Sequence, residues 1–275
     1  GAFASLAENK VMVDCDVDAA DLHILLQPEI KERHIFKSGY VAIIDHARCV
    51  YCGQCVDVCR FDAIHKKNGA ITLDPIACEG CGFCSIVCPR KAITLEENIA
   101  GEWFVSETRF GQMVHARLGI AEENSGKLVS QVRKKAKECA EETNAEWIII
   151  DGAPGIGCPV IASLSGVDLA VIVTEPTISG LHDADRVMQV ACHFKVPVVM
   201  VVNKYDLNSD VTRDIETFCS ANSIPLIGKI AFDEVVVKAM LERKTIIEYS
   251  QSGIAKSIRR IWKNICRILN KEKVV

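Results

Sequence analysis

The chain has 275 residues with 32 basic and 36 acidic side chains, which gives a formal net charge of −4. Apolar residues make up 49% of the composition, enough for a sizeable core, and this excludes disordered and collagen-like chains. The mildly acidic balance gives no reason to expect a nucleic-acid partner. No apolar run approaches the roughly 18 residues of a membrane-spanning helix.

Residues 1–44 read as the first part of an α/β domain. Gly1 to Asn9 is typical of the last turns of a helix, and Lys10 to Asp14 follows as an apolar strand. Further strand-like segments lie at His34 to Phe36 and at Tyr40 to Ile44. Because no strand precedes the first helix, we expect the β-α unit that should open this domain to be missing from the chain.

Cysteine is the unusual residue of the composition. The chain has 14 cysteines, and eight of them lie between Cys49 and Cys88. The total is below the roughly 8–10% of a disulfide scaffold, so clustering at this density predicts metal ligation. We therefore predict a cysteine-rich domain inserted at residues 45–96.

Two runs in this insert share the spacing C-x2-C-x2-C-x3-C, which is typical of cubane iron–sulfur sites. Three thiolates of one run bind one [4Fe–4S] cluster, and the fourth binds the other cluster. The expected ligands are Cys49, Cys52, Cys55 and Cys88 for one cluster, and Cys78, Cys81, Cys84 and Cys59 for the other. Zinc is the rival interpretation, but it usually takes four ligands as two separated pairs, which fits these runs poorly.

The insert resembles bacterial-type two-cluster ferredoxins, which are small α+β domains. Its halves repeat internally, since residues 49–64 match residues 78–93 position by position. Arg60 stands where this family usually has proline. The resemblance covers about 50 residues and includes all of the expected ligands.

Residues 97–275 return to alternating strands and helices. Strands are expected at Trp147 to Asp151, Leu169 to Thr174, Val198 to Val202 and Leu226 to Ile230. Helical patterns lie between them at about Gly126 to Glu142, Leu181 to Phe194, Asp210 to Asn222 and Glu234 to Leu241. Short Val/Ile runs between helices are typical of a parallel sheet covered on both faces. The fold class predicted is α/β, a doubly wound and mostly parallel sheet interrupted by the ferredoxin insert.

Five segments outside the insert resemble the MinD superfamily of P-loop ATPases, which includes the nitrogenase iron protein and the Mrp-type cluster carriers. They are Val13 to Asp18, Trp147 to Gly155, Glu175 to Asp183, Val202 to Asp206 and Lys229 to Asp233. In chain order, they match five parts of the family's structure. These are switch I, the Walker B strand with the turn after it, the loop and helix after the next strand, the segment that contacts the base, and the segment that closes over the base. The match is closest to MinD-like ATPases that carry an inserted ferredoxin domain.

The resemblance implies a site for ATP with Mg²⁺. Asp151 would hold Mg²⁺ through water, Asp16 would orient or deprotonate the attacking water, and Asp14 would have a structural role. Carboxylates at the ends of parallel strands lie at the ligand crevice, which agrees with these roles. The base would be held by Asn203, Asp206, Phe232 and Asp233.

The phosphate loop itself has no match in this sequence, neither as G-x-x-x-x-G-K-[ST] nor in its deviant form. In the family the loop comes immediately before the helix whose tail would be Gly1 to Ala7. We therefore expect the chain as written to bind ATP weakly or not at all, and the sequence leaves open whether it is an ATP hydrolase.

Six cysteines lie outside the insert. Cys15 and Cys158 adjoin the switch and Walker B segments, where either a redox or metal role or a small buried residue fits. Core positions are expected for Cys139, Cys192, Cys219 and Cys266.

Three further features were weighed against simpler structural roles. Arg109 and His115 could meet a partner or the clusters. The basic amphipathic tail at residues 253–275 is expected to pack on the sheet, and the alternative is a helix on a membrane surface.

The leading hypothesis is ATP-coupled electron transfer by two [4Fe–4S] clusters to a redox partner protein. The resemblance implies a homodimer or paralogue heterodimer that sandwiches nucleotide, and a cytoplasmic location. A cluster-assembly carrier and a plain electron carrier on a degenerate ATPase scaffold are the alternatives.

Overall fold

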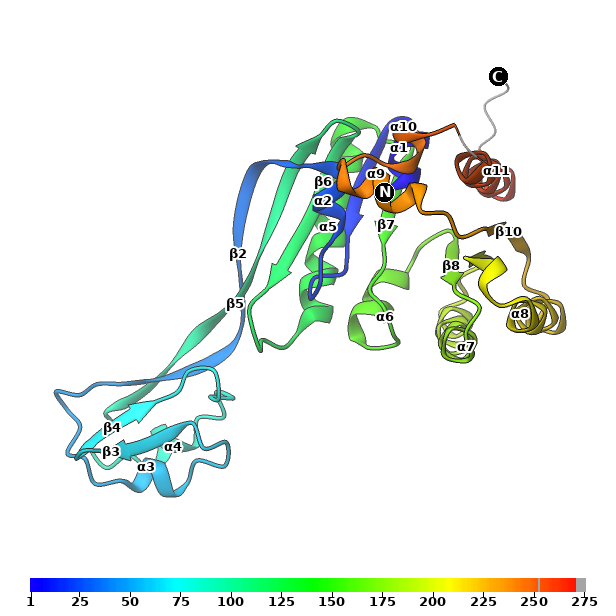
Figure 1. Cartoon of the computed structure of the whole chain (residues 1–275). Coiled ribbons are helices and arrows are strands. Elements are labelled where there is room, and N and C mark those ends of the chain that lie inside the picture. The colour runs from blue at the N-terminus through cyan, green and yellow to red at the C-terminus, as the bar shows by residue number, and fades with distance from the viewer. Residues whose placement is uncertain (252, 271–275) are drawn as a thin grey trace. The chain divides into compact units, whose positions relative to one another are not determined.

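The computed structural model describes residues 1–251 and 253–270, and the chain divides into two compact units (Figure 1). The first, here called the α/β unit, contains Gly1–Arg33, Phe104–Ala116 and the chain from Ser125 onward. The second, here called the cysteine unit, contains His34–Trp103 and Arg117–Asn124. Each unit has buried hydrophobic clusters of its own.

Five strands form the larger sheet, in the order β2-β5-β6-β1-β7. They are β1 (Lys10–Asp14), β2 (Glu29–Ile44), β5 (Ile93–Thr108), β6 (Gly111–Leu118) and β7 (Trp147–Asp151). β1 runs parallel to both of its neighbours, β6 and β7. Its apolar residues are almost fully buried, with Met12 and Met113 packed together in one core cluster. The short Val/Met run of β1 is therefore an interior strand of this sheet, as its burial on both faces requires.

A second sheet of three parallel strands has the order β10-β9-β8. Its strands are β8 (Ala170–Thr174), β9 (Val198–Asn203) and β10 (Leu226–Ile230). Helices α7 (Ile178–His193) and α8 (Ser209–Ala221) pack against one face through a cluster that contains Met188, Met200 and Ile215. The two sheets together confirm the mostly parallel α/β fold, although a single continuous sheet was expected.

The edge between the two sheets is open. In residues 1–251 and 253–270, β7 pairs with β1 and β8 pairs with β9, and no pairing joins β7 to β8. Apolar residues on both strands remain accessible, since Ile148 is 40% exposed and Val173 is 59% exposed. Both strands line a cavity of about 1780 Å³. These two edges have unpaired backbone groups of the kind that a further strand pairs with.

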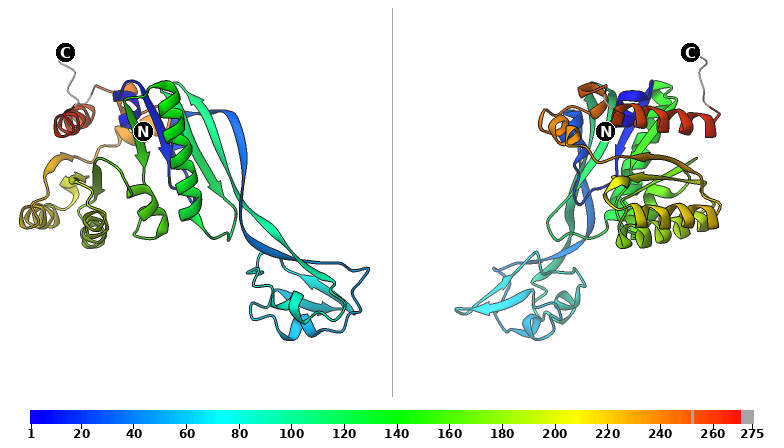
Figure 2. Two further views of the ribbon diagram at one scale, coloured as in Figure 1. Left: turned by 180° about the vertical axis from the view of Figure 1, so that it is seen from behind. Right: turned by 45° about the vertical axis from the view of Figure 1, so that its right-hand side comes forward.

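The remaining helices of the α/β unit are short, apart from α5 and α11 (Figure 2). They are α1 (Ala2–Leu6), α2 (Leu22–Leu26), α5 (Ser125–Thr143), α6 (Cys158–Leu164), the 3₁₀ turn η1 (Tyr205–Leu207), α9 (Val235–Leu241), α10 (Ile246–Tyr249) and α11 (Gly253–Ile268). Within the part of the chain that is described, no helix combines the length and the apolar character needed to cross a membrane.

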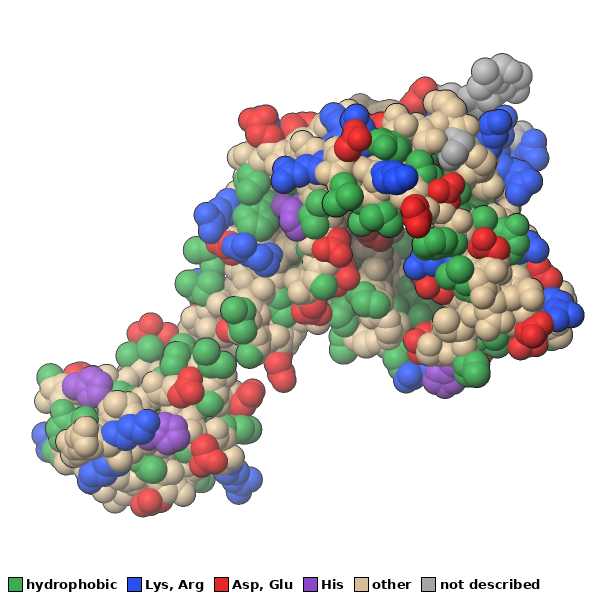
Figure 3. Space-filling view, viewed as in Figure 1, with side chains coloured by type: hydrophobic (Ala, Val, Ile, Leu, Met, Phe, Trp, Pro, Cys, Tyr) green, Lys and Arg blue, Asp and Glu red, His purple; other side chains and the backbone are tan. Residues whose placement is uncertain are grey.

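Helix α11 packs on β10, which confirms the expected packed tail up to Asn270. Ile258, Ile261 and Ile265 are buried. Ile261 lies very close to β10, because a Cβ atom added to Gly228 would be 2.3 Å from the Cγ1 atom of Ile261. Lys and Arg side chains gather on the outer face of the helix (Figure 3), including the exposed Lys256 and Lys263. Residues 271–275 of the predicted tail lie outside the described residues.

The cysteine unit is built on an antiparallel hairpin of β3 (Ile64–Lys67) and β4 (Ala70–Leu73) with two one-turn helices, α3 (Gln54–Asp57) and α4 (Phe83–Val87). β2 and β5 have residues in both units. The two short segments expected at residues 34–36 and 40–44 are parts of one 16-residue strand, β2. The expected insert at residues 45–96 thus begins directly after β2 and ends within β5, and both of these strands have residues in the α/β unit.

Candidate iron–sulfur and nucleotide sites

The two cysteine runs adopt the same local structure. In each run a glycine in the left-handed region precedes a short helix, with φ +89° at Gly53 and +78° at Gly82. Glycine adopts this backbone without steric cost, so the chain can turn tightly between the second and third cysteines. The third cysteines, Cys55 and Cys84, are buried, whereas the second ones are exposed. The internal repeat of the sequence is therefore also a repeat in the structure.

The first three cysteines of the first run share a cavity with the last cysteine of the second run. This cavity is lined by Cys49, Cys52, Cys55 and Cys88. Burial raises the pKa of the Cys55 thiol, and the charges of the other three thiols of this set raise it further. The grouping is the one expected for the first cluster, and it brings together residues that are 33 to 39 positions apart in the chain.

The four cysteines expected to bind the second cluster are less completely grouped in the structure. Burial raises the pKa of the Cys84 thiol, and the nearby Cys78 and Cys81 contribute to this shift. Cys59, the expected fourth ligand, is half-buried against the same core cluster as Cys78. Placement of all eight cysteines in one small unit agrees with their expected role, and the assignment of each thiolate to a cluster stays a prediction.

Backbone amides donate to the cysteine sulfurs at matching positions of the repeat. Ala63 donates its N–H to Cys59 Sγ at 3.3 Å, and Ala92 donates to Cys88 Sγ at 3.2 Å. Such hydrogen bonds to thiolate sulfur influence the reduction potential of an iron–sulfur cluster. Both halves therefore place a backbone donor at the sulfur of the fourth cysteine of the run.

Among residues 1–251 and 253–270, no three or more His, Cys, Asp or Glu side chains are arranged to hold a single metal ion. A cubane differs from a single ion because its four ligands stand apart around a cluster of four irons and four sulfides. Cys49, Cys52, Cys55 and Cys88 all line one cavity. The donor set of four thiols per cluster fits the [4Fe–4S] group.

Asp14, Asp16 and Asp151 lie at the carboxyl ends of β1 and β7. Asp14 and Asp151 are opposite each other in the register of these two parallel strands. The Asp14 side chain is only 2% exposed, its Oδ1 accepts the Asp16 N–H at 3.1 Å, and its Oδ2 has no hydrogen-bond partner. Burial, followed by repulsion from Asp151, raises the pKa of Asp14 to about 7.

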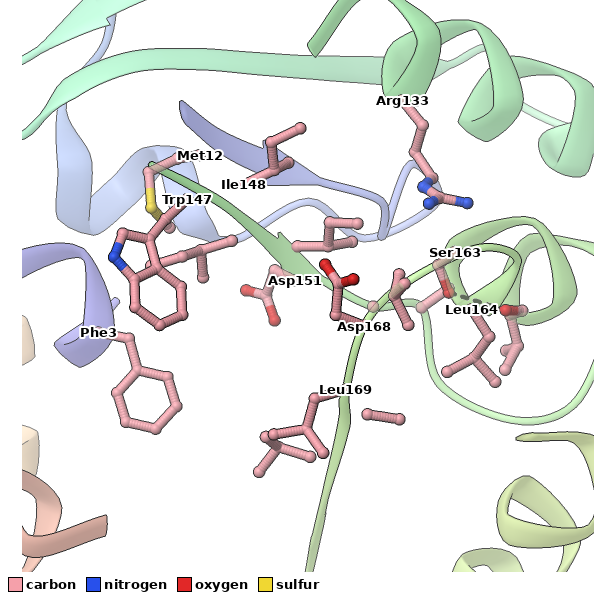
Figure 4. Close-up of a pocket in the computed structure, with 18 of the residues that line it drawn as sticks. Phe3, Met12, Arg133, Trp147, Ile148, Asp151, Ser163, Leu164, Asp168 and Leu169 are labelled. Carbon is pink, nitrogen blue, oxygen red and sulfur yellow. Dashed lines mark hydrogen bonds between the residues drawn. The ribbon is translucent and has the colours of Figure 1, made fainter. Parts of the chain in front are cut away.

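Asp151 lies at the large cavity between the two sheets (Figure 4). Desolvation raises the pKa of Asp151, and repulsion from Asp16 acts in the same direction. A buried, unpartnered carboxylate oxygen beside other carboxylates is an environment that a cation stabilises. Mg²⁺ uses only one or two protein carboxylates and takes its other ligands from phosphates and waters, so these residues fit it.

The expected base site is a corner at the end of the three-stranded sheet. Asn203 ends β9 and lies opposite Ile230 of β10. Asp206 Oδ1 accepts the backbone N–H of Phe232 at 2.7 Å, which joins the segments after β9 and β10. The Phe232 side chain is 46% exposed, and Asp233 is exposed and accepts the Val235 N–H at 2.9 Å. The structure thus brings together the four residues that were expected around a base.

The cysteines outside the insert fall into three environments. Cys15 is buried, and its pKa is raised to about 12 by burial, so it is an unreactive thiol. Cys158 is exposed at the first position of α6. Cys139 and Cys219 are buried as expected and Cys266 is partly buried. The expectation for Cys192 was wrong, because Cys192 is exposed.

Arg109 and His115 have partners inside the α/β unit. Arg109 forms a two-point ion pair with Glu248, at 2.8 Å from Nε to Oε1 and 2.9 Å from Nη2 to Oε2. His115 is buried and stacks on Phe104. Its Nε2 atom is hydrogen-bonded to Ser106 Oγ at 2.9 Å. Both residues therefore stabilise the fold of this unit.

Sequence reasoning missed two charged residues near the nucleotide-type site. Arg133 of α5 lines the cavity and donates through Nη1 to the carbonyl oxygens of Ala162 and Ser165 at the end of α6 (Figure 4). Lys204 forms an ion pair with Glu175 at 2.7 Å, which ties the segment after β9 to the segment after β8. Neither contact could be predicted from the neighbouring sequence, because each joins residues about 30 positions apart.

Comparison with known proteins agrees with this architecture. Residues 42–95 match the family of 4Fe-4S dicluster domains. MinD of Pyrococcus horikoshii, whose structure was solved in complex with Mg-ADP, has a similar fold, with a TM-score of 0.57 over 99% of this chain and 90% of that one at 16% identity. The fold and the cysteine site therefore define a MinD-like P-loop protein with an inserted ferredoxin domain.

Two proteins of Methanocaldococcus jannaschii, MJ0578 and MJ0579, match nearly the whole chain. MJ0578, described as uncharacterised, is 33% identical over 261 residues, which are 94% of this chain and 86% of the relative. MJ0579 is 25% identical over 241 residues, which are 87% of this chain and 81% of the relative. The chain belongs to the family of MJ0578.

Proposed function

We propose that this protein couples a Mg²⁺-nucleotide to electron transfer through two [4Fe–4S] clusters. The 4Fe-4S dicluster match supports the cluster domain, and the MinD-like fold supports a purine nucleoside triphosphate site. ATP is the nucleotide that the sequence resemblance implies. Thiol ligands that must stay reduced also fit a cytoplasmic location.

The observation that carries this proposal is the continuity of one sheet. β1 and β7 bring Asp14 and Asp151 together, and β2 and β5 of the same sheet continue into the cysteine unit. A change of charge at the ends of β1 and β7 therefore acts on a sheet that is covalently continuous with the cluster domain. Packed cores and interfaces that have two discrete arrangements carry such changes between sites.

Different residues of the chain would bind the Mg²⁺-nucleotide and the clusters. Asp151 and Asp16 would bind Mg²⁺ through water and orient the water that attacks the terminal phosphate, and Asp14 would support them from the buried side. The clusters would supply one-electron chemistry, with the eight cysteines of the insert as ligands. Glycines and backbone amides around those cysteines would set the polarity of the cluster surroundings.

The open edge between β7 and β8 bears on the phosphate site. One further parallel strand would pair with both edges and fill the cavity that β7 and β8 line. A strand followed by a phosphate loop at this place would bring backbone N–H groups close to Asp151. The expectation of such a segment ahead of Gly1 stays a prediction.

A dimer is the assembly that this proposal favours. Two relatives of the chain occur in one organism, so a homodimer and a heterodimer of paralogues are both supported. The redox partner would be a separate protein that exchanges electrons with the cluster domain. Light scattering of the purified protein, with and without Mg²⁺-nucleotide, measures the expected increase in mass.

The decisive experiment is an anaerobic redox titration, followed by electron paramagnetic resonance, of iron-loaded full-length protein that includes the phosphate-loop segment expected ahead of Gly1. We expect Mg²⁺-nucleotide to shift the midpoint potential of at least one cluster. Asp151→Asn should abolish the shift without loss of iron, and Asp210→Asn, which removes an exposed carboxylate of α8 that pairs with Arg213, should preserve it. Equal potentials with and without any purine nucleotide would contradict coupling, and rapid transfer of clusters to apo-ferredoxin would favour the carrier function.

A further inference from the structure

The two halves of the cysteine insert repeat in their ligands but not in their charges. Matching positions are 29 residues apart, since Cys49 matches Cys78. By this offset Lys66 of the first half stands where the second half has the apolar Leu95. The surroundings of the two expected clusters therefore differ at a charged position, although their ligands are alike.

Lys66 lies on the face of the β3–β4 hairpin that packs against the cysteine core. Ile64, two positions before it, is buried in the same core cluster as the cysteines. Its register partner on β4 is Ile71, which is also buried and lines the cavity that contains Cys49. Alternate residues of a strand, and residues directly opposite each other on neighbouring strands, share one face. The Lys66 side chain therefore begins on the face that the hairpin turns to this cavity.

The ammonium group of Lys66 is held at the first cysteine loop. Lys66 Nζ donates to the backbone carbonyl oxygen of Tyr51 at 2.8 Å, and Tyr51 lies between Cys49 and Cys52. The backbone N–H of Tyr51 donates in turn to Cys49 Sγ at 3.4 Å. Within residues 1–251 and 253–270 Lys66 forms no ion pair, so no carboxylate neutralises its charge. One residue, Tyr51, thus joins a free cation to a cluster ligand.

The second cysteine loop has a different pair of side chains at the matching positions. Glu79 is exposed and directly follows the first cysteine of its run, where the first run has Val50. Leu95 lies against the same loop, because its Cδ1 atom would be 3.0 Å from a Cβ atom added to Gly82. A carboxylate and an apolar side chain therefore replace the apolar side chain and the ammonium of the first loop.

The contact made by Lys66 distinguishes it from the other charged residues of the insert. Within the described part of the chain, it is the one charged side chain of residues 45–96 that hydrogen-bonds to either cysteine loop, residues 49–55 or 78–84. Asp57 and Asp62 of the first half are exposed. An arginine follows the fourth cysteine closely in both runs, as Arg60 and Arg90, so this charge does not separate the two clusters.

Reduction of an iron–sulfur cluster adds one electron, and thus one negative charge, to the region that its ligands enclose. A cation held nearby stabilises the reduced form, and a carboxylate opposes it. Net charge and solvent exposure are among the properties that set cluster potentials. Lys66 is itself exposed, so solvent weakens its effect, but the hydrogen bond to Tyr51 keeps the ammonium at the loop.

We propose that Lys66 raises the reduction potential of the first cluster, the one expected on Cys49, above that of the second. The inference rests on the proposed cluster function and does not depend on nucleotide. The first electron that a one-electron donor supplies then resides on the first cluster, the donor is oxidised by that electron, and no bond is made or broken. The second cluster is reduced only at a lower potential.

An anaerobic redox titration of the iron-loaded protein without nucleotide tests this proposal, with dithionite as the reductant and cluster absorbance as the signal. We expect two one-electron steps. Lys66→Gln keeps an N–H donor for Tyr51 but loses the charge, so the equilibrium constant for the upper step should fall about threefold to tenfold. A tenfold change corresponds to about 59 mV for one electron. The lower step should stay in place, and Lys66→Arg, which retains the charge, should preserve both steps.

Two further variants make the comparison specific. Lys67→Gln removes the same charge from the next residue of β3, which belongs to the opposite face of the hairpin, and should move the upper step less. Leu95→Lys gives the second half the lysine of the first half. It should raise the lower step and bring the two steps closer together.

The outcomes separate this inference from the cluster function on which it rests. An upper step that Lys66→Gln leaves unchanged, or lowers no more than Lys67→Gln does, would overturn the proposal. A fall in the lower step alone would overturn it as well, because Lys66 would then act on the other cluster. Loss of iron from Lys66→Gln would assign the residue to the shape of the loop instead. Natural protein that binds far fewer than about eight irons would refute the two-cluster function itself.

Discussion

Asp14 and Asp151 are register partners at the ends of two adjacent parallel strands, and one oxygen of Asp14 is buried without a partner. Burial of Asp14, followed by repulsion from Asp151, raises the pKa of Asp14 to about 7. The folded protein thus maintains an electrostatically unfavourable site. Such a site gains stability when a cation binds or when one carboxyl is protonated.

Asp14→Asn should stabilise the protein in a pH-dependent way. The pKa of Asp14 is higher in the folded protein, about 7, than its ordinary value of 3.8, so folding favours the protonated form. Stability is therefore lost as the pH rises from about 4 to about 7, and it stays lower above that range. We expect the variant to gain about 1–3 kcal/mol in the free energy of unfolding at pH 8 and less at pH 5.

Urea denaturation at the two pH values, without Mg²⁺ and nucleotide, measures this gain. Asp18→Asn is the matched control, because Asp18 is exposed and its loss should change stability by no more than about 0.5 kcal/mol. A variant at Asp14 that is less stable than the natural protein at pH 8 would show that the carboxylate is held by favourable contacts instead.

Glu248 should show the opposite pH dependence. Its hydrogen bonds from Arg109 lower its pKa from 4.5 to about 2, and the Thr245 N–H at 2.8 Å adds to this. A carboxyl with a lowered pKa contributes stability above pH 4.5, and that contribution disappears as the pH falls toward 2. Because the pair is partly exposed, we expect Glu248→Gln to cost only about 1–2 kcal/mol at pH 7.

The cost of Glu248→Gln should shrink steadily below pH 4.5, which thermal unfolding followed by circular dichroism can measure. Glu242→Gln removes a more exposed ion pair with Lys244 and should lower the melting temperature less than Glu248→Gln does at pH 7. A cost that does not change with pH would mean that shape, and not charge, makes Glu248 important.

The parts of the fold that were predictable from sequence are those with a local cause. The strands ending at Asp14 and Asp151 were found because short apolar runs end in carboxylates. β5 and β6 were not predicted, and in β5 the polar residues 94–98 hide the strand that the apolar residues 103–105 continue. The joining of Asp206 to Phe232 could not be derived, since the hydrogen bond links residues 26 positions apart.

Cys192 shows the same limit inside a helix. Its spacing from Met188 is one helical turn, and its Sγ lies 3.7 Å from Met188 Sδ. Met188 is 9% exposed, but Cys192 lies at the edge of the buried face and is exposed. The apolar periodicity of the sequence predicted which face of α7 is buried. It did not predict how many residues on either side of that face are covered, because this depends on the sheet that packs against the helix.

Crossed ligation predicts which pairs of cysteine substitutions damage one cluster and which damage both. If Cys49 and Cys88 bind the same cluster, Cys49→Ala combined with Cys88→Ala leaves the other cluster whole and retains about half of the iron. Cys78→Ala combined with Cys88→Ala removes a ligand from each cluster and should retain much less. Iron analysis after anaerobic reconstitution distinguishes the two, and the reverse order of iron contents would show uncrossed ligation.

Gly80 and Gly53 allow a last prediction, because both have a left-handed backbone but different neighbours. A Cβ on Gly80, at φ +60°, would lie 2.1 Å from the carbonyl oxygen of Tyr40, whereas nothing lies within 4 Å of one on Gly53 at φ +89°. Gly53→Ala should therefore cost only the left-handed strain of about 1–2 kcal/mol. Gly80→Ala adds a backbone clash that no side-chain movement relieves.

We expect Gly80→Ala to lose iron and to melt at a clearly lower temperature than Gly53→Ala, since its loop must move away from β2. The measurement is thermal unfolding of both variants after reconstitution under identical conditions, with the absorbance of the clusters as the signal. Left-handed strain is common to both positions, so the difference between the variants reports the contact with Tyr40 alone. Equal melting temperatures would mean that the loop around Gly80 can shift at no cost, and that its closeness to β2 does not help to hold the second cluster.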